Sequence, residues 1–322
     1  MPTLETVRTL MTGIIDYAGL FPPAKLEMAS AVEQYAAHRT HPHAWMLARF
    51  ICPVTRFGEF AAAAGPHLAR ISTSNTPGSA SDTDDAPDAD DSIEPNPDRW
   101  KLSALIPGFA QLDDGLEAAT TLEQQFGDAL AITAAEMRVA QVHEIDDTAD
   151  AMPEGVDLYF EIPLDGDYRG HLAAIAGVEC GAKIRCGGVT ADLFPSPETV
   201  ATFIARCRDA QVPFKATAGL HHPIRHHNDS VNTKMHGFLN VFGAAILART
   251  KGLGAGELQR VLEAEDPAAF AFTEREVRIL DWTVDLTQIE RGRTFAVGYG
   301  SCSFEEPVED LQGLGLLDKD SG

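Results

Sequence analysis

Lysine is scarce in this chain, and basic residues as a whole are few. Only 7 of the 322 residues are lysine, and Lys and Arg together number 25 against 48 Asp and Glu, which gives a net charge of −23. Such a charge repels phosphates and anionic headgroups, so nucleic acid and membrane surfaces are not expected as partners. No apolar run of about 18 residues occurs, so we expect no transmembrane helix.

Cysteine is sparse as well: the five residues are scattered, and no C-x-x-C pair is present. This usage favours reduced, mostly buried thiols. The first residues, MPTLETVRTLMTGIIDYAG, contain acids and lack the basic-then-apolar pattern of a secretion signal, which predicts a cytoplasmic protein. The acid-rich, lysine-poor composition also predicts a halophilic protein, because salt screens its self-repulsion.

The segment 71–98 differs from the rest of the chain in composition. It holds eight acids and no base, with Ser, Pro and Gly throughout. Such a segment buries too little apolar surface to order itself. We therefore predict a disordered acidic insertion within a folded domain.

Elsewhere, short apolar runs alternate with amphipathic stretches such as 28–39, 114–126 and 196–211. This alternation predicts β-α units and a parallel sheet. Eight strand-like runs favour a closed (β/α)₈ barrel of the TIM type over an open doubly wound sheet, whose glycine fingerprint is missing. We expect one barrel domain over 1–322, with 250–322 as a C-terminal helical extension and tail. The expected strands are 13–21, 45–53, 101–108, 136–144, 156–163, 182–188, 212–219 and 237–245.

Charged residues in two neighbouring runs are the candidates for a site, because barrel active sites lie at the carboxyl ends of the strands. Side chains two apart on a strand share a face, so Lys183 and Arg185 point the same way, as do Lys215 and Thr217. With Glu161 as the acid that can pair with one of them, the expected interior has a surplus of positive charge. This surplus predicts a small anionic ligand, such as a carboxylate or a phosphate.

Three further residues are candidate substrate contacts. Asp16 falls in the first run and Asn240 in the expected eighth run, and Arg225 follows the seventh run in a loop. An arginine in that loop is suited to clamp a substrate carboxylate.

The stretch FKATAG resembles the lysine-bearing strand of the class I, Schiff-base aldolases, especially the deoxyribose-phosphate aldolase family. Lys215, Thr217 and Gly219 match the K-T-S-T-G-type strand of that family in type and spacing, and Lys183 is similar to its second lysine. The resemblance covers two strands of eight, and HHP follows Gly219 where that family builds a phosphate-binding glycine loop. It implies that Lys215 forms an imine with a carbonyl substrate, while Lys183 lowers the pKa of Lys215.

The residues are consistent with that chemistry. Desolvation and a nearby cation both lower the pKa of a lysine, which must lose its proton to attack a carbonyl. Glu161 and Tyr159 are the alternative candidates to move protons. The first hypothesis is therefore a lyase of the aldolase type that acts on a small anionic carbonyl compound and needs no cofactor.

Histidines favour a second hypothesis. Five of the eleven lie within 221–236, and His221 and His222 directly follow Gly219 and Leu220. On a loop above a barrel, they could bind a divalent metal with Glu161 or Asp16, which predicts a metal-dependent lyase or hydrolase. A third hypothesis is a barrel that binds an anion without catalysis. Association into a homo-oligomer and the role of Cys302, in GSCSFEEP, stay open.

Overall fold

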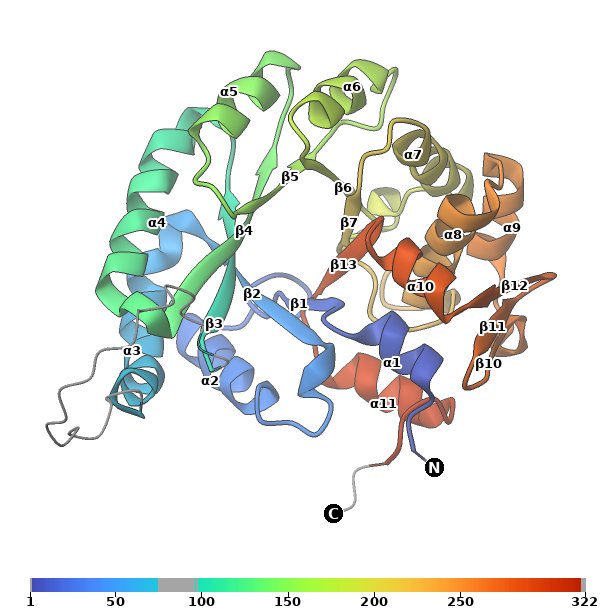
Figure 1. Cartoon of the computed structure of the whole chain (residues 1–322), viewed down its shortest axis with the longest axis horizontal. Helices are drawn as coiled ribbons and strands as arrows, with labels where there is room; N and C mark the ends of the chain where they lie inside the picture. The colour runs from blue at the N-terminus through green and yellow to red at the C-terminus, as the bar shows by residue number, and fades with distance from the viewer. Residues whose placement is uncertain (1, 75–95, 97, 320–322) are drawn as a thin grey trace, which may run out of the picture.

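Eight parallel strands close into a barrel that is surrounded by helices (Figure 1). The structure is a computed structural model that describes residues 2–74, 96 and 98–319. The order around the barrel is β1 to β7 followed by β13, which pairs with both β7 and β1. This is the (β/α)₈ barrel that the sequence predicts. The barrel strands are Ile15–Tyr17 (β1), Leu47–Pro53 (β2), Trp100–Ile106 (β3), Leu130–Arg138 (β4), Asp157–Glu161 (β5), Gly181–Arg185 (β6), Phe214–Thr217 (β7) and Ala296–Ser301 (β13).

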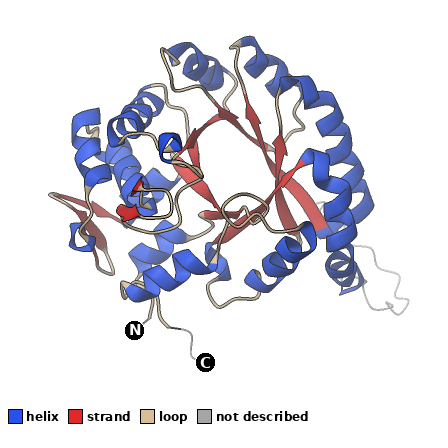
Figure 2. Ribbon diagram, turned by 180° about the vertical axis from the view of Figure 1, so that it is seen from behind, coloured by secondary structure: helices blue, strands red, loops and turns tan. Residues whose placement is uncertain are grey.

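A ring of helices covers the outer face of the barrel (Figure 2). Helices α2 to α8 follow strands β1 to β7 in turn, α11 follows β13, and α1 precedes β1. The helices are Glu5–Met11 (α1), Met28–His38 (α2), Phe57–Ser74 (α3), Leu112–Phe126 (α4), His143–Ala151 (α5), Arg169–Gly177 (α6), Pro197–Asp209 (α7), Phe238–Lys251 (α8), Ala255–Glu263 (α9), Leu286–Arg293 (α10) and Glu305–Gly313 (α11).

Two small antiparallel sheets lie outside the barrel. One is a hairpin of His226–Asn228 (β8) and Thr233–Met235 (β9) in the connection between β7 and α8. The other joins Phe270–Phe272 (β10), Glu276–Ile279 (β11) and Trp282–Asp285 (β12), and it packs against α8. Among the described residues, no helix has the length and apolar character needed to cross a membrane.

The run 237–245 is a helix, so its assignment as the eighth strand was wrong. It forms most of α8, in which every side chain from Phe238 to Ala248 is buried. A helix that is covered on all sides carries no amphipathic pattern, and its sequence therefore looks like a buried strand. The eighth strand is β13, whose sequence AVGYGS lies in the segment expected to be an extension. The expected extension therefore supplies the eighth barrel strand, while β10, β11 and β12 lie outside the barrel.

Two boundaries also differ from expectation. Strand β4 begins at Leu130 and ends at Arg138, so the expected run 136–144 covers only its last three residues and extends into α5. Helix α3 continues to Ser74, and therefore includes the first four residues of the segment 71–98. Most of that acidic segment lies outside the described residues.

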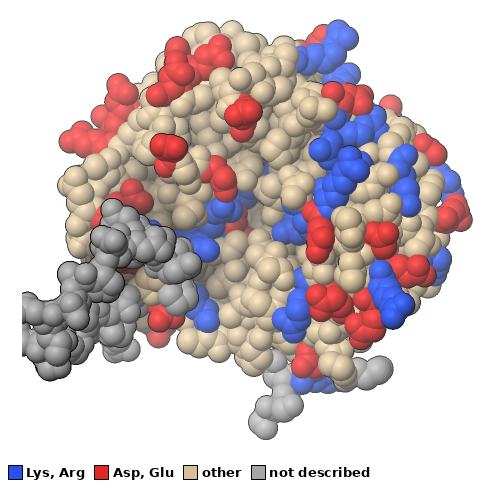
Figure 3. Space-filling view, in the orientation of Figure 1, with Lys and Arg blue, Asp and Glu red and all other residues tan. Residues whose placement is uncertain are grey.

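Helix α7, which follows the connection from β6, begins with a capped first turn. Ser196 Oγ accepts a hydrogen bond of 3.1 Å from the backbone N–H of Thr199, and Pro197 is the first helical residue. Both are favourable features of a helix start. Asp and Glu side chains are spread over the periphery of the face seen in Figure 3, with Lys and Arg side chains among them.

Candidate active site

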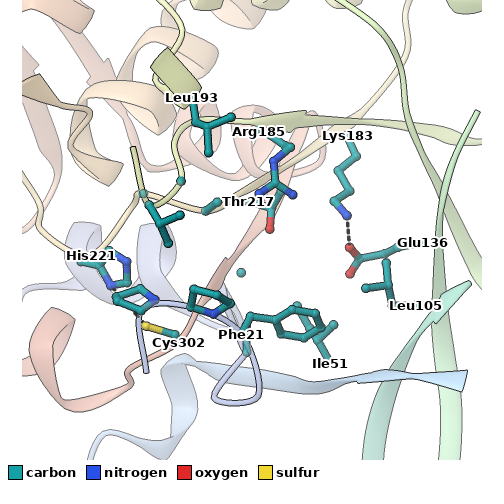
Figure 4. A pocket seen from close by; sticks show the side chains of 18 residues that line it. Phe21, Ile51, Leu105, Glu136, Lys183, Arg185, Leu193, Thr217, His221 and Cys302 are labelled. Carbon is teal, nitrogen blue, oxygen red and sulfur yellow. Dashed lines mark hydrogen bonds and ion pairs between the residues drawn. The ribbon is translucent and has the colours of Figure 1, made fainter. Parts of the chain in front are cut away.

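A pocket of about 190 Å³ opens at the carboxyl ends of the barrel strands. Its lining comes from six of the eight strands and from the loops that follow β1, β6, β7 and β13. Figure 4 places Lys183 and Glu136 on one side, His221 and Cys302 on the opposite side, and Leu193 at the top of the view. The volume is below the roughly 300–1,000 Å³ typical of drug-sized ligands, so the pocket suits a small molecule.

Two lysines and three carboxylates form a charged cluster at the floor of this pocket. Lys183 Nζ lies 2.8 Å from Glu136 Oε2 and 3.1 Å from Glu161 Oε2. Lys215 Nζ contacts Asp16 Oδ2 and Glu136 Oε1. Glu136 therefore bridges the two lysines, which lie opposite each other in register on β6 and β7.

Two neutral donors complete the cluster. Ser103 Oγ donates a hydrogen bond of 2.7 Å to Glu136 Oε1, and the backbone N–H of Arg49 donates one of 3.0 Å to Asp16 Oδ1. Ser103, Asp16, Glu136 and both lysines are buried. Buried charges are tolerated only when they are paired and hydrogen-bonded, and this network meets both conditions.

The charge balance at the floor differs from the predicted surplus of positive charge. With Asp16 and Glu136 included, three carboxylates face the two ammonium groups at the floor and the Arg185 guanidinium group beside Lys183, so the charges balance. Burial raises the pKa of Glu136, but Lys183 and Lys215 lower it by more, and the carboxyl group stays ionised. Its pKa lies well below the ordinary value.

Lys215 does not fit the role of a lysine with a lowered pKa. Burial lowers its pKa, but the carboxylates of Asp16 and Glu136 outweigh that effect and hold the pKa above its ordinary value. Its side chain is 1% exposed and is not part of the pocket lining, whereas Lys183 lines the pocket at 5% exposure. The lysine that can meet a ligand is therefore Lys183.

Arg185 and Thr217 also line the pocket, one layer nearer to its mouth than the two lysines. They lie opposite each other on β6 and β7, and Arg185 points into the pocket beside Lys183 (Figure 4). Within the described part of the chain, neither side chain has an ion pair or a hydrogen bond. A guanidinium group and a hydroxyl group are thus available to a ligand.

His221 and His222 turn toward helix α11 rather than toward each other. His221 Nδ1 lies 3.2 Å from Glu306 Oε2 and 3.8 Å from Cys302 Sγ, and His222 Nδ1 lies 2.6 Å from Asp310 Oδ2. Burial lowers the pKa of His221, but Cys302 and Glu306 together raise it to about 9. Of the two histidines, only His221 lines the pocket.

The two histidines predicted as metal ligands therefore interact with separate acidic side chains. His221 and His222 pair with different acids, and neither pairs with Glu161 or Asp16. Across residues 2–74, 96 and 98–319, no group of three or more His, Cys, Asp or Glu is arranged to hold a metal ion.

Asn240 and Arg225, predicted as substrate contacts, lie outside the pocket lining. Asn240 is on α8 rather than on a strand, and its amide group donates bonds of 2.8 Å to the carbonyl groups of Val261 and Ala264. Its Oδ1 accepts a bond of 2.9 Å from the backbone N–H of Arg225. These contacts hold the loop and α9 together, which is a structural role.

Glu136 is the central residue that the sequence analysis missed. It is the seventh residue of β4, near the carboxyl end, whereas the expected run began with it and so placed it at the amino end. The sequence nevertheless indicated that a second acid was needed. Two buried lysines and one glutamate leave one lysine without a carboxylate partner. An acid inside the apolar stretch LAITAAEMR was the nearest candidate.

Comparison of the chain with protein-family models, curated proteins and solved structures finds no match. The fold and the site define a (β/α)₈ barrel with a small pocket over a buried lysine–carboxylate cluster.

Proposed function

We propose that the protein is a lyase of the aldolase type, in which Lys183 forms an imine with a small anionic carbonyl compound. The observation that carries the proposal is the position of Lys183: it lines the pocket, its amine contacts the carboxyl groups of Glu136 and Glu161, and an unpaired arginine lies beside it. Arg185 supports the anionic character of the compound. Lys183 takes the nucleophilic role that the resemblance to class I aldolases implied for Lys215.

The carboxylates suit an imine because the positive charge stays in place during the reaction. Lys183 transfers a proton to Glu161 and attacks the carbonyl carbon with its free amine. Glu161 returns that proton to the carbonyl oxygen, the nitrogen gives up a second proton, and the oxygen leaves as water while the nitrogen keeps one proton. The protonated imine then holds its positive charge where the ammonium group held it, opposite Glu136. Fixed charges aimed at a developing charge stabilise it without reorganisation.

The protonated imine provides the electron sink for a carbon–carbon bond. When the bond between the α and β carbons breaks, its electron pair moves toward the imine nitrogen and leaves an enamine. The hydroxyl group on the β carbon gives its proton to the Glu161 carboxylate and becomes the carbonyl group of the released product. Lys215 has a different role in this proposal. Its ammonium group holds Asp16 and Glu136 in place, and through Glu136 it fixes the position of Lys183.

Borohydride trapping tests the proposal with a panel of oxo acids and aldehydes, so the experiment does not depend on one chosen substrate. The protein is incubated with each compound, reduced, and analysed by intact mass and peptide mapping. We expect an adduct on Lys183 that disappears in Lys183→Met and persists in Lys101→Met, a matched change of an exposed lysine on β3. An adduct on Lys215 would overturn the choice of nucleophile. No adduct with any member of the panel would overturn the imine.

A further inference from the structure

The mouth of the pocket has a different chemistry from its floor. Phe21, Pro22 and Pro23, from the loop after β1, form one apolar wall. Val189 and Leu193, from the connection between β6 and α7, form the other. The two aliphatic residues are 54% and 43% exposed, and they belong to the few large apolar side chains that the described residues leave exposed.

The aliphatic wall is held in place by close packing. A Cβ atom on Gly188 would lie 2.4 Å from Leu193 Cδ1, and one on Gly187 would lie 2.4 Å from Phe194 Cε1. The connection thus folds back so closely on itself that only glycine fits at these two positions. Ordered apolar side chains exposed at the rim of a pocket favour an apolar ligand group between them.

The polar contacts available to a ligand are few and lie on one side. Of the cationic side chains in the pocket lining, Lys183 and His221 have acidic partners, and Arg185 has none among the described residues. Thr217 lies beside Arg185 in register on β7. One unpaired guanidinium group next to one hydroxyl group matches a single carboxylate.

We infer that the ligand is a short oxo-monocarboxylic acid with an apolar chain. Its carbonyl group reaches Lys183 at the floor, its carboxylate binds Arg185 and Thr217, and its chain lies between Phe21 and Leu193 at the mouth. Arg185 follows Lys183 by two residues, or about 6.6 Å along the strand, so the two groups contact neighbouring parts of one small molecule. The carbonyl part of this assignment rests on the proposed imine, whereas the carboxylate and chain parts do not.

Calorimetric titration with simple carboxylates separates these parts, because ethanoate, butanoate and hexanoate carry no carbonyl group. We expect affinity to rise about four-fold for each added methylene until the chain fills the mouth. Arg185→Gln should weaken the binding of all three acids by roughly ten- to hundred-fold. The double variant Val189→Ser with Leu193→Ser should leave ethanoate unchanged and remove most of the gain with chain length.

Val142→Ser is the matched control, because Val142 is an exposed valine outside the pocket lining. It should keep the full dependence on chain length. Affinity that does not rise with chain length would overturn the inference, as would a dependence that survives the double variant. Inorganic phosphate binding more tightly than butanoate would overturn the carboxylate. A change of oligomeric state in the double variant, without a change in binding, would assign the apolar rim to a contact between copies of the chain.

Trapping experiments distinguish this inference from the proposed function. Oxo acids of increasing chain length should be trapped on Lys183 at decreasing concentrations. If carboxylate binding depends on Arg185 and on chain length but no adduct is trapped, the imine hypothesis is refuted and the carboxylate-binding site is supported. If adducts form at the same concentration for every chain length, the imine hypothesis is supported and the preference for an apolar chain is refuted.

Discussion

Replacing Lys215 by methionine should reveal whether this lysine stabilises the floor of the barrel. The change removes the ammonium group that contacts both Asp16 and Glu136. Glu136 keeps Lys183 at 2.8 Å and the Ser103 hydroxyl at 2.7 Å. Asp16 keeps the backbone N–H of Arg49 at 3.0 Å and the longer-range attraction of the Arg49 and Arg293 guanidinium groups, but it loses the ammonium group in direct contact with its charge.

The expected cost follows from the loss of that direct contact. Removing one partner of a buried ion pair costs about 3–5 kcal/mol, and here most of it falls on Asp16. Urea unfolding followed by circular dichroism measures the loss in the free energy of unfolding. Lys101→Met, at an exposed position on β3, should change it by less than about 0.5 kcal/mol.

A double-mutant cycle tests the assigned cause. Asp16→Asn removes the charge that Lys215→Met leaves unpaired, so the double variant should lose less stability than the sum of the single variants. We expect a coupling energy of about 2–3 kcal/mol between residues in such contact. A loss below about 1 kcal/mol for Lys215→Met, or additive losses in the cycle, would refute the argument that Lys215 serves to compensate Asp16.

Three other predictions concern pH, thiol reactivity and salt. His221 has a pKa of about 9 against 6.5 in the unfolded chain, so its pairing should stabilise the fold fully below about pH 6.5 and lose that effect as the pH rises through 9. The half-exposed Glu306 limits the effect to about 1–2 kcal/mol, and His221→Gln should remove this slope in urea unfolding. Iodoacetamide should label Cys302, and hexanoate should slow that labelling while leaving Cys180, which lies outside the pocket lining, unchanged in peptide maps. The net charge of −23 should make the free energy of unfolding rise between about 0.1 M and about 3 M KCl, and a flat dependence would contradict the predicted halophilic character.

Local sequence patterns were sufficient for most of the barrel but not for its closure. Strands β1 to β7 are each preceded or followed by stretches of helical period, and this alternation survives in a single sequence. Strand β13 lacks that signal: Gly298 and Gly300 weaken its strand propensity, whereas α8 is apolar on every side. The choice between them depends on which segment fills the gap between β7 and β1, and this is a property of the whole barrel.

Strand periodicity placed Lys183 with Arg185 and Lys215 with Thr217, and the structure pairs these residues in register across β6 and β7. Because the two strands are equivalent in this respect, the pattern alone gives both lysines the same surroundings. It could not indicate which of them faces the pocket.

The difference between the lysines arises from strands that are distant in sequence. Asp16, on β1, meets Lys215 only because β13 bridges β1 and β7 when the barrel closes. Glu136, on β4, then reaches across the interior to both lysines. Lys215 receives two carboxylates beneath the floor and is fixed as an ammonium ion, which disfavours attack on a carbonyl. Lys183 shares Glu136 and takes its second partner, Glu161, from the neighbouring strand, so its amine stays at the pocket surface. Barrel closure therefore gives the two lysines different roles: Lys215 is a buried counter-charge for the carboxylates, and Lys183 can contact a substrate.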